Sequence, residues 1–149
     1  MTAKSDFTEE EWGLVAEGPA IAGMIAATAQ KGGTFRESYA LAKTYAEARQ
    51  HHGESELLDT LVSEKPHFDR HKYHSAEELQ GQGLQRIHEA TSLLESKATP
   101  DDVTAYKTFT LNVAKNVAAA HKEDGEKVSP AEEAAIAAVS ASLEGGGPA

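Results

Sequence analysis

The sequence predicts an all-α fold, a compact bundle of about seven helices, on three observations. Alanine, the best helix former, supplies much of the 40% hydrophobic share, whereas the strand-favouring aromatic residues make up only 6%. Helix start signals recur along the chain, and no segment alternates polar and apolar residues as a half-buried strand does. The length of 149 residues is typical of one domain with one core.

The helix starts are the clearest of these signals. A Ser or Thr followed three residues later by Glu can satisfy two free backbone N–H groups reciprocally, in a capping box. This spacing occurs in the pairs Thr8 and Glu11, Thr34 and Glu37, and Ser75 and Glu78. Two further starts place proline directly after the cap, where its missing N–H is not needed. They are Thr99-Pro100 with Asp102 and Ser129-Pro130 with Glu132.

Glycine and proline mark the expected helix ends. Gly18-Pro19 is predicted to close a first short helix, Pro66 to break the fourth, and glycines to end most of the others. The seven expected helices span residues 8–17, 19–30, 35–52, 55–64, 76–97, 100–121 and 130–143. Gly81 and Gly83 weaken the fifth helix by about 1 kcal/mol each relative to alanine, so its first turns are expected to fray or kink.

The helix expected at 19–30 is rich in small and apolar residues, which favours a position at the centre of the core. The helix expected at 100–121 presents an apolar stripe to it, formed by Val103, Tyr106, Thr110, Val113, Val117 and Ala120. Residues 26–43 and 118–138 share one plan: an Ala-rich helix, a polar turn with glycine, a cap and a second helix. Two explanations of this shared plan stay open. Either the chain contains two related helical hairpins around the small-residue central helix, or Ala-rich helices simply resemble each other in composition.

Charge and composition exclude several classes of function. Acidic residues number 24 against 14 Lys and Arg, and the formal charge of -10 opposes binding to nucleic acid. The longest apolar stretch is about half the roughly 20 residues that span a membrane, so we expect no membrane insertion. The absence of cysteine and of a secretory signal favours the cytoplasm. We expect one domain over 1–144 and a flexible tail over 145–149.

A local resemblance to a known family lies near the end of the chain. The run 116–143, NVAAAHKEDGEKVSPAEEAAIAAVSASL, resembles the helix, Asp-Gly turn and second helix of the tellurite-resistance TerB-like proteins. The resemblance implies an all-helical bacterial stress protein whose acidic turn holds a divalent cation, with Asp124, Glu132 and Glu133 at the matching positions. Lys122 departs from the family pattern close to that turn. FTEEEW followed by GPAIAGMIAATA also resembles small bacterial helical proteins, which implies no activity.

Three of the seven histidines lie between the fourth and fifth expected helices. In a helix, His67, His71 and His74 would share one face with Glu78, an arrangement suited to a divalent metal ion. Ser75 is also the predicted cap of the next helix, which argues against one helix through all four residues. The alternative is an exposed, locally basic connector.

No catalytic signature accompanies these candidates. Glu47 and His51 lie one turn apart near a helix end, where histidine also interacts with the helix dipole. Nucleophile-elbow, phosphate-loop and dinucleotide motifs are missing. Trp12 is either a docking aromatic or a clamp on the core.

We therefore expect no enzyme and no required cofactor, but a bacterial helical binding or scaffold module with a protein partner or a homodimer. The alternative is a divalent-metal-binding stress-response protein.

Overall fold

The computed structural model describes residues 4–28, 34–50, 55–64, 73–119 and 130–144. In this part of the chain, six α-helices follow a short 3-10 helix, η1 (Lys4–Asp6), and no strand is present. The helices are α1 (Glu9–Thr28), α2 (Thr34–Gln50), α3 (Glu56–Ser63), α4 (Ala76–Lys97), α5 (Pro100–Ala119) and α6 (Pro130–Leu143). The predicted all-α class is confirmed.

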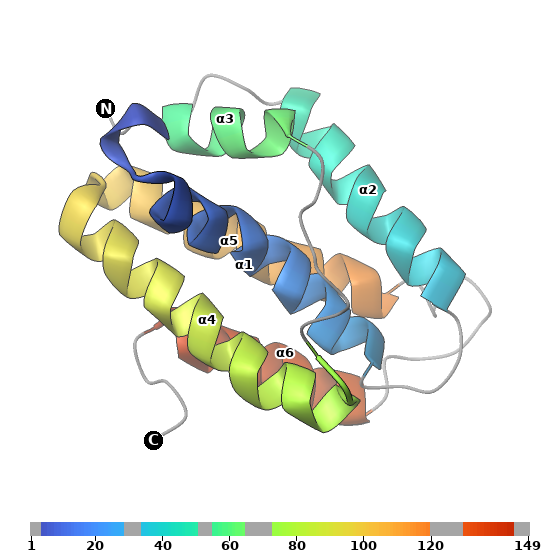
Figure 1. The fold of residues 1–149 in the computed structure, drawn as a ribbon. Coiled ribbons are helices and arrows are strands. Elements are labelled where there is room, and N and C mark those ends of the chain that lie inside the picture. Colours follow the sequence, from blue (N-terminus) through green and yellow to red (C-terminus); the bar gives the residue numbers. More distant parts are fainter. Residues whose placement is uncertain (1–3, 29–33, 51–54, 65–72, 120–129, 145–149) are drawn as a thin grey trace.

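Helix α1 lies at the centre of the bundle (Figure 1) and contacts α2, α4, α5 and α6. Every residue from Val15 to Gly23 is buried, so α1 has no solvated face over these turns. Apart from Glu17, these turns carry only apolar or small residues, as expected of a helix in such a central position, because each of its sides meets a neighbour. The expected packing of the 100–121 helix against the small-residue helix is confirmed by the contact between α5 and α1.

The two helices expected at 8–17 and 19–30 are a single helix, and this prediction was wrong. Pro19 lies inside α1 instead of ending the helix before it. Proline removes the N–H that would bond to the carbonyl four residues earlier, here the carbonyl of Val15. The hydroxyl of Tyr106 on α5 donates a 2.8 Å hydrogen bond to that carbonyl instead. The described part of the chain therefore has six helices, one fewer than the seven expected.

Predicted helix caps are confirmed wherever their side chains are described. Thr8 and Glu11 form the reciprocal capping box of α1, with 2.9 Å and 3.1 Å bonds between side chain and backbone. Ser75 Oγ accepts from the Glu78 N–H at 3.0 Å at the start of α4. Thr99 Oγ1 accepts from the Asp102 N–H at 3.3 Å at the start of α5. The side chains of Thr34, Glu37 and Ser129 lie outside the described residues.

Helix α4 is helical throughout from Ala76, and its two glycines do not interrupt it. Gly83 is buried against α1: a Cβ atom at this position would stand 2.7 Å from Ile21 Cγ2. Gly81 is exposed, and a Cβ atom there would meet nothing within 4 Å. The glycine at 83 thus permits the close approach of α4 to α1, a contact that helix propensity alone does not reveal.

The two pairs proposed as related hairpins, α1 with α2 and α5 with α6, each form contacts within the bundle. Their internal duplication stays a hypothesis, because both intervening turns lie outside the described residues. The expected tail over 145–149 lies outside them as well. Among the described helices, none is long and apolar enough to cross a membrane.

Candidate functional site

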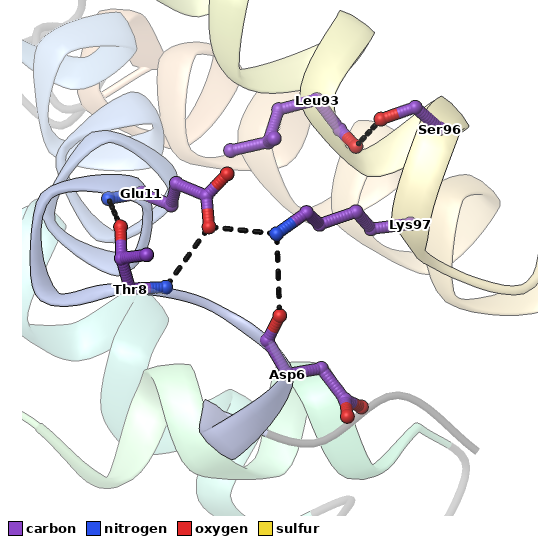
Figure 2. A network of polar contacts seen from close by, with 6 residues as sticks. All are labelled: Asp6, Thr8, Glu11, Leu93, Ser96 and Lys97. Carbon is purple, nitrogen blue, oxygen red and sulfur yellow. Dashed lines mark hydrogen bonds and ion pairs between the residues drawn. The ribbon is translucent and has the colours of Figure 1, made fainter.

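The start of α1 is tied to the end of α4 by a polar network (Figure 2). Lys97 Nζ lies 2.7 Å from Glu11 Oε1 and 3.4 Å from the backbone carbonyl oxygen of Asp6. The same Glu11 oxygen accepts from the Thr8 N–H, so one carboxylate both caps α1 and binds α4. The hydrogen bond from Lys97, followed by that from the Thr8 backbone, lowers the pKa of Glu11 below its ordinary value of 4.5.

Aromatic residues support this network from the core side. Trp12 is 5% exposed, and its ring centroid lies 6.0 Å from that of Phe7. Lys97 Nζ stands 5.7 Å from the centroid of the Phe7 ring, within the range of a cation–π contact. Trp12 Nε1 donates a 3.2 Å hydrogen bond to Glu64, just after the end of α3. The geometry favours Trp12 as a clamp on the core over an exposed docking residue.

A deeply buried carboxylate joins α1 to α4 further along the bundle. Glu17 is 4% exposed, and its Oε2 atom accepts from Arg86 Nε at 2.8 Å and lies 2.6 Å from Arg86 Nη2. The Arg86 side chain is 34% exposed, so the pair reaches the surface on its arginine side. A buried carboxylate is strongly disfavoured without such a partner, which makes the pair a requirement of this packing.

A second buried carboxylate joins α3 to α5. Ser55 is the N-cap of α3, and its hydroxyl donates a 2.7 Å hydrogen bond to Asp102 Oδ1 in the first turn of α5. The same hydroxyl accepts from the Leu58 N–H at 3.2 Å. Asp102 and Ser55 are each 4% exposed. One serine therefore caps one helix and fixes the start of another.

The predicted metal ligands are only partly within the described residues. His67, His71 and Asp124 lie outside them. His74 is exposed, directly before the Ser75 cap of α4. Glu78 Oε2 accepts from the His74 backbone N–H at 3.4 Å, and Glu78 Oε1 accepts from Gln82 Nε2 at 3.1 Å. Both carboxylate oxygens of Glu78 thus make hydrogen bonds at the helix start.

Other candidate side chains are dispersed. Glu47 and Glu133 are exposed on α2 and α6, whereas His51 and the side chain of Glu132 lie outside the described residues. His88 is half-buried on α4, with its Nδ1 atom 3.4 Å from the Ser142 carbonyl oxygen on α6. Within the described ranges, no group of three or more His, Asp or Glu side chains is placed to hold a metal ion.

Reasoning from the sequence missed the polar residues that join helices across the core. Glu17 carries no motif, and Asp102 was interpreted only as part of a helix start. Their partners, Arg86 and Ser55, stand 69 and 47 residues away, and no local spacing signals such pairs. Comparisons of the chain with known families, characterised proteins and solved structures find no match.

Proposed function

We propose that the chain is a non-enzymatic helical binding or scaffold module. The observation that supports this proposal is that buried polar side chains of the described residues hold pairs of helices together. Glu17 bonds α1 to α4, Asp102 bonds α5 to α3, and Tyr106 bonds α5 to α1. Each belongs to a different helix pair and each is occupied by a structural hydrogen bond. A catalytic site requires instead that such groups converge on one place that a substrate can reach.

A module of this kind acts through its surface, and the partner we propose is another protein chain. The formal charge of -10 favours a partner whose contact surface is neutral or basic, and it opposes nucleic acid. A second copy of the chain is the partner that can be tested with the purified protein alone. Because two copies repel each other through this charge, a homodimer would strengthen as added salt screens the repulsion.

The first experiment asks whether the buried carboxylates are catalytic. The full chain and the variants Glu17→Gln and Asp102→Asn are screened for hydrolase and transferase turnover, with circular dichroism to confirm folding. The proposal predicts no turnover by any of them. Turnover by the full chain that a folded variant loses would contradict it.

The second experiment measures self-association by sedimentation velocity over a range of protein concentrations, at low and at physiological salt. A homodimer predicts a mass that rises with concentration and rises further with salt. A monomer at all concentrations and both salt levels excludes the second copy as the partner.

The alternative function is divalent-metal binding by a stress-response protein. One observation favours keeping it: α4 and α6 contact each other, and both begin at the same end of the bundle (Figure 1). The segment that holds His67 and His71 leads into α4, and the segment that holds Asp124 leads into α6. In the sequence, the predicted ligands thus precede two neighbouring helix starts, although the described residues at this end hold no group of ligands by themselves.

Calorimetry with zinc, nickel and calcium on protein freed of metal tests this alternative. Loss of zinc or nickel binding in His67→Ala/His71→Ala would assign it to the histidines, and loss of calcium binding in Asp124→Asn would assign it to the acidic turn. No heat of binding at high micromolar metal removes the alternative.

A further inference from the structure

One backbone hydrogen bond is missing at the centre of α1. Pro19 has no N–H, so the carbonyl of Val15, four residues earlier, lacks its usual partner. This place is inaccessible to water, because Val15 is 0% exposed and its neighbours through Gly23 are buried. A buried carbonyl without a donor is destabilising, so another donor has to satisfy it.

Tyr106 supplies that donor from a different helix. Its hydroxyl donates to the Val15 carbonyl at 2.8 Å across 91 residues of sequence, and its side chain is 0% exposed. Gly18 makes room for it, since a Cβ atom at that position would collide with the Tyr106 hydroxyl. Burial raises the pKa of Tyr106 above the usual 10. The hydroxyl therefore keeps its proton, and its ability to donate, throughout the ordinary pH range.

The two halves of α1 make different contacts on either side of Pro19. The first half carries Trp12, which bonds to Glu64, and Glu11, which binds Lys97. The second half packs closely at Gly23, where a Cβ atom would stand 3.0 Å from Val113 Cγ1. Because each half has its own contacts, residues 9–17 can move relative to 20–28 only if α1 bends at Pro19, where the backbone hydrogen bond is missing.

We propose that Gly18 and Pro19 form a hinge in the central helix and that the Tyr106 hydroxyl holds this hinge closed. The docking of α5 then decides whether α1 is one continuous helix or two segments that move separately. Opening would displace the segment 9–17 and, with it, the contacts to the ends of α3 and α4. This proposal concerns the fold and is independent of the function proposed above.

A double-mutant cycle tests the proposal through one backbone N–H. Tyr106→Phe removes the donor, and Pro19→Ala restores the helical N–H that can bond to the Val15 carbonyl. Urea unfolding should show that Tyr106→Phe lowers the folding equilibrium constant about ten-fold or more when Pro19 is present, since a buried carbonyl loses its partner. In the Pro19→Ala background, Tyr106→Phe should also lower the folding equilibrium constant, but by a factor that is several-fold smaller. Equal losses in both backgrounds would contradict the proposal.

Tyr45→Phe is the matched control. Tyr45 is 1% exposed, and its hydroxyl is buried without a hydrogen-bond partner among the described residues. Removing this hydroxyl should not lower the folding constant, and Pro19→Ala should not change its effect. If Tyr45→Phe behaves like Tyr106→Phe, the loss reflects removal of any buried hydroxyl and the proposal fails.

Amide hydrogen exchange distinguishes a hinge from general destabilisation. In Tyr106→Phe, exchange should accelerate more for amides of residues 9–17 than for those of 20–28, because the first segment moves when the hinge opens. An even acceleration along α1 would overturn the hinge. If Tyr106→Phe alone does not fold, the proposal predicts that adding Pro19→Ala restores folding, and failure of this rescue would overturn it as well.

Discussion

At the scale of single residues, glycine has opposite roles at two neighbouring positions of α4. Gly81 is exposed in open space, whereas Gly83 is buried against Ile21 of α1. We expect Gly81→Ala to raise the free energy of unfolding by about 1 kcal/mol through helix propensity. Gly83→Ala adds the same methyl group but should lower the free energy by about 1–3 kcal/mol, because α4 must move away from α1. Urea denaturation of both variants measures the difference, and changes of the same sign would show that the close approach is absent.

The carboxylate of Glu11 makes part of the stability dependent on pH. Lys97 and the Thr8 backbone lower its pKa in the folded protein, so its contribution is present above the ordinary value of 4.5 and is lost as pH falls through the lowered value. Glu11→Gln keeps an acceptor for the cap but cannot ionise. We therefore expect the stability advantage of the native chain over this variant to shrink between about pH 5 and pH 3. Thermal unfolding across this range tests it, and a constant difference would contradict the role assigned to the charge.

At the scale of helices, the two serine caps differ in what they hold. Ser75 is exposed and caps α4 only, whereas Ser55 is buried, caps α3 and also donates to Asp102 of α5. Ser75→Ala should lower the free energy of unfolding by about 1 kcal/mol. Ser55→Ala should lower it by roughly 2–3 kcal/mol, because a buried carboxylate oxygen also loses a donor. Chemical denaturation of the pair measures this, and equal losses would mean that the Asp102 bond adds nothing.

Local signals predicted the helices and failed where a distant residue intervenes. The capping boxes at Thr8 and Ser75 are confirmed because the groups that satisfy each other lie within one turn. The sequence predicts a helix end at Pro19 because proline removes a backbone donor, and nothing near it in sequence replaces that donor. The replacement comes from Tyr106, 91 residues away from the acceptor, and such a partner becomes visible only in the folded chain.

At the scale of the whole molecule, contacts between residues that are distant in sequence also limit what the sequence predicts about function. The stripe from Val103 to Val117 predicted which face of α5 is buried, since periodicity reports burial directly. It did not predict the pairs Glu17 with Arg86 and Asp102 with Ser55, which depend on how α1, α3, α4 and α5 cross. The histidine and Asp124 predictions stay predictions, because their key members lie outside the described residues.

Helix α1 runs unbroken through the middle of the bundle, and amide exchange of Ala20 and Ile21, followed by NMR on the native chain, tests this continuity. In a continuous helix these two amides bond to Ala16 and Glu17 and are buried, so they should be among the slowest to exchange. In a separate helix whose first residue is Pro19, the same two amides would be unbonded groups of the first turn. We expect slow exchange at both positions, and rapid exchange there would show that α1 is two helices.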